Sequence, residues 1–125
     1  MNSYSNYTDE QINHLVANKI MGWTISDVED DWGLCWITDE DGNHIMDERV
    51  WRPCKDMNQA FESVKRLLKM GFNRIELTVE YQFQEDSHIL WRAYIDRSTS
   101  RCWESILPNP ARALCEALLQ AEEEK

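Results

Sequence analysis

The chain has 125 residues, and 42% of them are hydrophobic, which suits a single folded domain with a packed core. Its 23 acidic and 13 basic side chains give a net charge of −10, which disfavours binding to nucleic acid and to anionic membranes, because both need clustered Lys and Arg. The N-terminus lacks the pattern of a signal peptide and no apolar run approaches the roughly 18 residues of a membrane span, so we expect a cytoplasmic protein.

A first helix is predicted over about residues 8–21. Thr8 and Gln11 have the spacing of a capping box, in which each side chain satisfies the free backbone N–H of the other residue. Gly22 follows the last residue of the apolar stripe and is typical of a helix C-terminus. Residues 1–7 are expected to form a flexible lead, so residues 8–125 would make up one α+β domain.

A hairpin is predicted near residues 33–50, after an acidic loop at residues 26–31. Residues 33–38 favour a strand, and Asp41-Gly42 is a typical two-residue hairpin turn. We expect this turn to bring the rings of Trp36 and Trp51 near each other.

The same region, TDEDGNHIMDE at residues 38–48, also has some features of a calcium-binding loop. If Gly42 takes the glycine position of such a loop, Asp39, Asp41 and Glu48 fall at three of its ligand positions. The first ligand position would then be Ile37, which has no side-chain oxygen. We therefore interpret the stretch as an Asp-rich turn and expect no metal site there.

A second helix is predicted over about residues 56–70 and a third over about residues 110–122. Asp56 is expected to cap the second helix, and Asn109, followed by Pro110, the third. The inner face of the third helix would be made of Leu114, Cys115, Leu118 and either Ala111 or Ala121. The second helix has a wide apolar face made of Met57, Ala60, Phe61, Val64, Leu67 and Leu68.

Residues 74–106 are predicted to form a three-stranded antiparallel meander. Apolar residues from Ile75 to Phe83 alternate with polar ones, which indicates a strand with one buried and one solvated face. A second alternating segment begins at Ile89 and a third strand at Arg101, with short connections between them. Because strands and helices are segregated along the chain, the sequence predicts an α+β fold with a mainly antiparallel sheet.

No motif for catalysis or cofactor binding is present. The chain has no nucleophile elbow, phosphate-binding loop or dinucleotide fingerprint. Potential zinc ligands are not paired at ligand spacing; they are His14, His44, His88, Cys35, Cys54, Cys102 and Cys115. We therefore expect no enzyme activity, no metal and no cofactor, and four reduced thiols that are buried or half-buried.

Aromatic and arginine side chains give the best indication of a ligand-binding site. Aromatic stacking combined with Arg–phosphate pairing is how many proteins hold nucleotides. The alternative is that the tryptophans belong to the core and that the arginines pair with the abundant carboxylates. The candidate binding residues are Trp36, Trp51, Arg52, Arg92, Tyr94 and Arg101.

Three short motifs together resemble the phage ABA-sandwich family, small proteins of bacteriophages and prophages. The motifs are LVANKIMGW at residues 15–23, Trp51-Arg52-Pro53 before the second helix, and PARALCEAL at residues 110–118. The resemblance implies an α/β sandwich and a phage or prophage origin, but no catalytic residues. The acidic stretch 27–31 and Cys54-Lys55 depart from the family pattern.

These observations predict a non-enzymatic phage accessory protein that acts by binding. In the favoured version, a homo-oligomer sequesters a small nucleotide-type host signal. In the alternative, the acidic protein inhibits a host factor by direct interaction, as its charge of −10 suits a basic partner.

Overall fold

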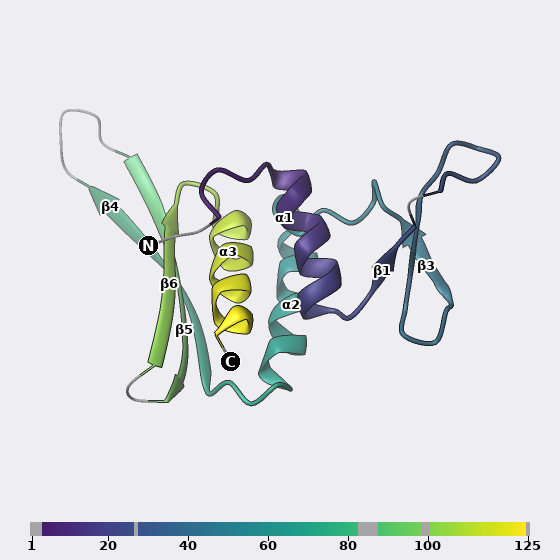
Figure 1. The fold of residues 1–125 in the computed structure, drawn as a ribbon. Coiled ribbons are helices and arrows are strands. Elements are labelled where there is room, and N and C mark those ends of the chain that lie inside the picture. Colours follow the sequence, from purple (N-terminus) through teal and green to yellow (C-terminus); the bar gives the residue numbers. More distant parts are fainter. Residues whose placement is uncertain (1–3, 27, 83–87, 99–100, 125) are drawn as a thin grey trace.

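The computed structural model describes residues 4–26, 28–82, 88–98 and 101–124. Within them, the chain has the predicted α+β architecture, with three helices and two three-stranded antiparallel sheets. Figure 1 shows the helices between the two sheets, which lie at opposite ends of the molecule. The sequence predicts the strands but not their division, because the hairpin near residues 33–50 forms a sheet separate from the meander.

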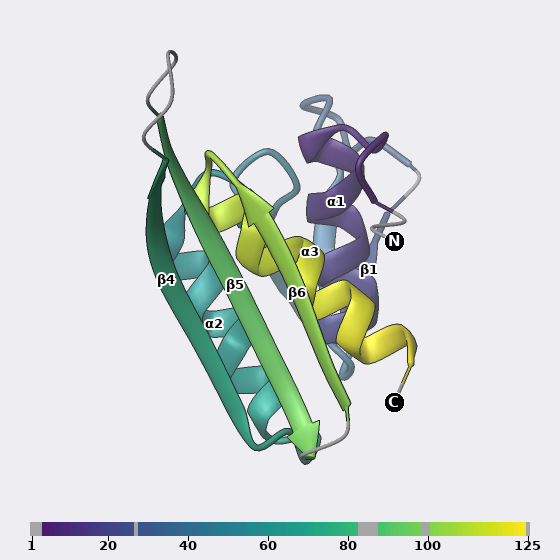
Figure 2. The same cartoon turned by 90° about the vertical axis from the view of Figure 1, so that its left-hand side faces the viewer.

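The larger sheet is the predicted meander, made of β4 (Arg74–Gln82), β5 (His88–Ser98) and β6 (Arg101–Leu107) in that order. Ala93, Ile95 and Trp103 are buried on the side that faces the helices. No helix covers the other side, the outer face, which is turned to the viewer in Figure 2. The predicted buried face is confirmed at Ala93 and Ile95 but is wrong at one end of the sheet, where Val79 is 56% and Ile89 52% exposed. Phe83, the last residue of the predicted alternation, lies outside the described residues.

The four cysteines are free thiols that differ in exposure. Cys54 and Cys115 are buried and Cys35 is half-buried, as predicted. Cys102 is exposed, so the prediction is wrong for this residue. Cys102 pairs with Asp96 in the sheet register and so lies on the uncovered face.

Helix α3 (Pro110–Glu123) is the centre of the fold. Asn109 caps it by accepting hydrogen bonds from the N–H groups of Ala111 and Arg112 at 3.0 and 3.3 Å. The residues expected on the inner face are all buried, namely Ala111, Leu114, Cys115, Leu118 and Ala121. The burial extends further than predicted, because Ala113, Glu116, Ala117 and Leu119 are buried too. A helix that packs on both sides must be apolar all round, and α3 lies between the larger sheet and the other helices (Figure 1).

Helix α1 (Asp9–Leu15) continues as a short π-helical segment, η1 (Val16–Ile20). The capping box is present, with 2.8 Å from the Thr8 N–H to Gln11 Oε1 and 3.1 Å from the Gln11 N–H to Thr8 Oγ1. Gly22 ends the helix with φ of 74°. The predicted first helix is confirmed, with a π-helical last turn that local spacing does not indicate.

Helix α2 (Met57–Leu68) is capped by Asp56, whose carboxylate accepts from the N–H groups of Asn58 and Gln59. Ala60, Ser63 and Leu67 form its buried face. The predicted apolar face is wider than the part that is covered, since Phe61 is 45% and Leu68 42% exposed.

The smaller sheet contains β1 (Thr24–Ile25), β2 (Trp36–Thr38) and β3 (His44–Asp47). Ile37 is fully buried and joins this sheet to the core. The β2–β3 hairpin is present, but its turn begins at Asp39 rather than at Asp41, because the Gly42 N–H donates to the Asp39 carbonyl at 3.1 Å. The Asp39 carboxylate accepts from the N–H groups of Asp41 and Asn43, both at 2.9 Å, which is an ordinary role for Asp in a turn.

Residues 4–7, which the sequence places in a lead outside the domain, contact α3. Tyr4 is buried, and its hydroxyl donates to Glu123 Oε2 at 2.8 Å. The Arg112 guanidinium donates to the carbonyls of Tyr4 and Tyr7 at 3.1 and 2.7 Å. These contacts make residues 4–7 part of the packed domain.

Candidate functional site

The six candidate binding residues lie in three separate parts of the fold. Trp36 is in β2, Trp51 and Arg52 precede α2, and Arg92, Tyr94 and Arg101 are in the larger sheet. The side chain of Arg101 lies outside the described residues. Since β2 and the larger sheet are at opposite ends of the molecule (Figure 1), the six residues do not form one site.

On the outer face of the larger sheet, the described arginines pair with carboxylates. Arg92 Nε lies 3.7 Å from Glu104 Oε2, and Arg74 Nε lies 3.1 Å from Asp96 Oδ2. The Arg74 guanidinium also lies over the ring of Tyr94, 5.6 Å from its centroid. Desolvation, together with contacts to Cys102 and Asp96, raises the pKa of Tyr94. This arrangement corresponds to the alternative interpretation, in which the arginines pair with nearby carboxylates.

The Trp51 ring is not available for stacking on a ligand. It is 3% exposed, packs edge-on against Trp23 at 4.8 Å between ring centroids, and donates its indole N–H to the Asn13 carbonyl at 2.9 Å. Trp36 instead stacks on His44 at 5.2 Å. Each of the two tryptophans thus has a different ring partner, and no ring contact between them occurs among the described residues.

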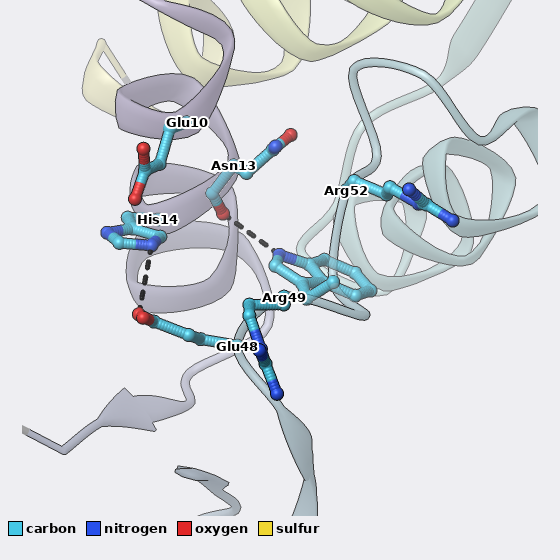
Figure 3. Close-up of a pocket in the computed structure, with 7 residues that line it drawn as sticks. Glu10, Asn13, His14, Glu48, Arg49 and Arg52 are labelled. Carbon is cyan, nitrogen blue, oxygen red and sulfur yellow. Dashed lines mark hydrogen bonds and ion pairs between the residues drawn. The ribbon is translucent and has the colours of Figure 1, made fainter. Parts of the chain in front are cut away.

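A pocket of about 260 Å³ lies between α1 and the segment that follows β3; we call it the α1 pocket. It is lined by Glu10, Asn13, His14, Glu48, Arg49, Trp51 and Arg52 (Figure 3). His14 Nε2 lies 3.4 Å from Glu48 Oε2, and both Nε and Nη2 of Arg49 donate to Asp47 Oδ2. Arg52 is exposed and has no ion-pair partner within the described part of the chain.

The α1 pocket is lined by acidic, basic and histidine side chains from two facing segments. Glu10 and His14 come from α1, whereas Glu48, Arg49 and Arg52 come from the facing segment (Figure 3). Among the described residues, no group of three or more His, Cys, Asp or Glu side chains is placed to hold a metal ion. No described helix is both long and apolar enough to span a membrane.

Residues 24–48, which contain the smaller sheet, carry nine of the 23 acidic side chains of the sequence; we call them the acidic lobe. The segment contains nine carboxylates and neither Lys nor Arg; the acids are Asp27, Glu29, Asp30, Asp31, Asp39, Glu40, Asp41, Asp47 and Glu48. The smaller sheet lies at the end of the molecule away from the larger sheet (Figure 1). The acidic lobe is therefore separated from the Arg-bearing outer face. Among its described carboxylates, Asp47, Glu40 and Glu48 lie near Arg49, Arg66 and His14, which come from outside the lobe.

Within the acidic lobe, Asp30 organises the loop that leads into β2. Its Oδ1 accepts from the N–H groups of Trp32 and Leu34 at 2.8 and 2.9 Å, and its Oδ2 accepts from the Trp36 indole at 2.7 Å. The Trp36 hydrogen bond is the largest of the contacts that lower the pKa of Asp30. These bonds fix the backbone on both sides of Trp32, whereas the Trp32 side chain itself is 86% exposed.

Trp32 is the residue that the candidate list lacks. Trp32 lies between Asp31 and Gly33 in the acidic stretch. An aromatic residue between an acid and a glycine in a predicted loop is the sequence signal that could have identified it. Val28, in the same loop, is 76% exposed. Tryptophan is among the residues enriched at the energetic centres of protein interfaces, so this exposed ring is a candidate anchor.

Comparison of the chain with models of protein families, with curated proteins and with solved structures gives no match. The resemblance to the phage ABA-sandwich family therefore stays a prediction from short motifs.

Proposed function

We propose that this protein acts by binding, without catalysis, and that the acidic lobe is its contact surface for a basic protein. The observation that carries the proposal is the 86% exposed Trp32 within a segment of nine carboxylates and no Lys or Arg. The apolar ring supplies an anchor, and the surrounding charge selects the partner.

The properties of an interface anchor support this proposal. Tryptophan is among the residues enriched at the energetic centres of protein interfaces. Because Asp30 already fixes the backbone around Trp32, binding would order few additional bonds, which limits the entropic cost of association. The carboxylates would accelerate encounter with a basic surface and disfavour acidic partners.

In the phage or prophage setting that the sequence motifs imply, the partner would be a host protein. A basic protein surface that normally binds phosphate groups would be blocked by a carboxylate-rich surface, so the chain would act as an inhibitor. The proposed inhibitor role thus follows from the expected phage origin together with the carboxylates of the acidic lobe.

Affinity capture from a bacterial lysate with four forms of the chain, the fourth being Trp32→Ala, tests the proposal. The first is the natural chain, and the second is the lobe variant Glu29→Gln/Asp31→Asn/Asp41→Asn, whose altered residues are exposed. The third is a control with the same charge change at exposed positions outside the lobe, Glu10→Gln/Glu76→Gln/Glu104→Gln. We expect a basic protein to be held by the natural chain and the control, but weakly by the lobe variant and by Trp32→Ala.

The captured protein should also dissociate as salt is raised, because exposed charge pairs are screened over about 8 Å at physiological ionic strength. Purified partner and chain should then bind with the same ranking of variants. Equal capture by all forms, or no basic protein captured at low salt, would contradict the proposal.

A second candidate function is the binding of a small nucleotide-type ligand, in homo-oligomeric form, through the α1 pocket. The observation that favours it is the exposed Arg52 guanidinium at this pocket, which has no ion-pair partner among the described residues. Calorimetry against a panel of cyclic and ADP-ribose-type nucleotides tests it, with Arg52→Ala as the variant and Lys55→Ala as the matched control. Heat that Arg52→Ala abolishes supports the site, and a panel without heat removes it.

A further inference from the structure

A second cavity, of about 440 Å³, lies at the C-terminal end of α2; we call it the α2 pocket. It is lined by Met21, Glu62, Lys65, Arg66, Leu68 and Lys69. Three of these side chains are cationic and one is acidic, which is unusual in a chain with a net charge of −10. Leu68 is 42% exposed, so the α2 pocket combines an apolar surface with positive charge.

One contact within the chain already pairs the acidic lobe with this pocket. Arg66 Nη2 lies 2.5 Å from Oε1 of Glu40, a residue of the β2–β3 turn. Lys65 pairs with Glu62 at 3.2 Å, but both side chains are more than 60% exposed, so this contact is weak. Lys69 has no ion-pair partner within the described residues. Lys65 and Lys69 are therefore available to carboxylates from another molecule.

We propose that Trp32 of one copy docks in the α2 pocket of a second copy, an inference that rests on the proposed role of the acidic lobe as a binding surface. The indole would pack on Leu68 and Met21, and the carboxylates of Glu29 and Asp31 would face Lys65 and Lys69. Lysine ammonium groups beside an indole also gain cation–π attraction.

Charge complementarity favours a second copy as the occupant. The lobe of this chain is acidic and carries an exposed aromatic anchor, whereas its α2 pocket is basic and has an exposed apolar side chain. The lobe would supply the carboxylates and the aromatic ring, and the pocket the positive charge and the apolar surface on which the ring packs. An unrelated acidic protein at the α2 pocket would be an alternative occupant, and the mixing experiment below separates the two.

The contact joins two different surfaces, so it is head-to-tail rather than symmetric. In a pair, one copy keeps a free α2 pocket and the other keeps a free acidic lobe, so further copies can add until a ring closes. Self-association would occupy acidic lobes and so compete with the basic partner proposed above.

Sedimentation velocity of the purified full chain over a range of concentrations tests the proposal. Salt is set near 0.15 M, where a Debye length of about 8 Å screens the repulsion between two chains of net charge −10 but not contacts at short range. We expect concentration-dependent association. Trp32→Ala, and separately Lys65→Glu/Lys69→Glu, should each weaken it by roughly 30-fold or more, the effect of losing an interface hot spot.

The decisive sample mixes the two variants. Trp32→Ala keeps an intact α2 pocket, and Lys65→Glu/Lys69→Glu keeps an intact Trp32 loop. Their mixture should therefore form a 1:1 complex, although each variant alone associates only weakly. Phe61→Ala and Lys19→Glu/Lys55→Glu change exposed residues outside the α2 pocket and serve as matched controls that should associate like the natural chain. Circular dichroism confirms that each variant is folded.

The proposal is overturned if the natural chain stays monomeric at every concentration. It is also overturned if Trp32→Ala or Lys65→Glu/Lys69→Glu associates as strongly as the natural chain. Failure of the mixture to form a 1:1 complex would overturn the head-to-tail contact even if each variant is monomeric. This result is distinguishable from a failure of the proposed function. The Lys65→Glu/Lys69→Glu variant keeps an intact acidic lobe, so it should still capture the basic partner even though it no longer self-associates.

Discussion

Arg112 and Glu116 lie one turn apart on α3, and Arg112 Nε donates to Glu116 Oε2 at 2.8 Å. The Glu116 side chain is only 1% exposed and that of Arg112 13%. Arg112 also donates to Asp9 Oδ1 at 2.6 Å and to two carbonyls in residues 4–7. One guanidinium therefore neutralises a buried carboxylate and joins α3 to α1 and to the N-terminal segment.

Replacement of Arg112 by Met should strongly destabilise the fold. Removing one partner of a buried ion pair leaves the other charge uncompensated, which costs about 3–5 kcal/mol in the free energy of unfolding. Urea unfolding measures this loss. Arg49→Met is the matched control, since Arg49 pairs with Asp47 but is 70% exposed, and it should cost no more than about 1 kcal/mol. Equal effects of the two substitutions would contradict the role given to Arg112.

Asn13 should hold the segment before α2 in place through one buried hydrogen bond. Its side-chain oxygen accepts from the Cys54 N–H at 3.0 Å, and both residues are buried. Asn13→Leu would leave that N–H without a partner, which costs about 1–3 kcal/mol. Asn18→Leu, at an exposed position of the same helical segment, is the control for the change of residue type. Denaturant midpoints should fall for the first variant and change little for the second.

The acidic lobe should lose stability in acid. The pKa of Asp30 is lowered mainly by the Trp36 indole, that of Asp39 by the Asn43 N–H, and that of Asp47 by Arg49. A carboxyl whose pKa is lower in the folded state stabilises the fold above its unfolded pKa of about 3.9, and this contribution disappears as pH falls through the folded value. Asp30→Asn should therefore lower the melting temperature at pH 7 and have a smaller effect at pH 3. A difference of the same size at both pH values would refute this assignment.

The four thiols should react in an order set by their exposure. Cys102 is exposed and should react first with a thiol reagent, whereas Cys54 and Cys115 are buried and should react only when the protein unfolds. The hydrogen bond with Cys54 and burial both raise the pKa of Cys115, which reduces its thiolate fraction further. Cys102→Ser should remove the fast phase in a time course with such a reagent. A fast phase that persists would show that another thiol, such as the half-buried Cys35, reacts as fast as Cys102, and would contradict the predicted order.

The sequence predicts the elements whose causes are local. The Thr8–Gln11 capping box, the Asp56 cap and the Asn109–Pro110 pair all identify helix starts, because capping depends on residues within one turn. Strict alternation identifies β4 for a similar reason, as successive side chains of a strand point to opposite faces.

The candidate site was less predictable. Trp51 and Arg52 do line the α1 pocket, but the ring of Trp51 is covered by Trp23 and Asn13, which come from α1 and the segment after it. Arg92 faces Glu104 across a strand pair. Spacing along the chain contains no information about which aromatic ring another segment will cover. Trp32 is exposed in the folded protein, whereas Trp36 and Trp51, the tryptophans chosen from the sequence, are half-buried and buried.

What the sequence by itself determined is the α+β class, the three helix positions, the meander and the concentration of carboxylates in residues 24–48. Only the tertiary structure decided that the hairpin forms a separate sheet, that α3 is buried on all sides, and that Trp32 projects from the acidic lobe. The physical reason is that caps and alternation act between neighbours in the chain, whereas burial is decided by segments that are distant in sequence and meet only in the folded protein.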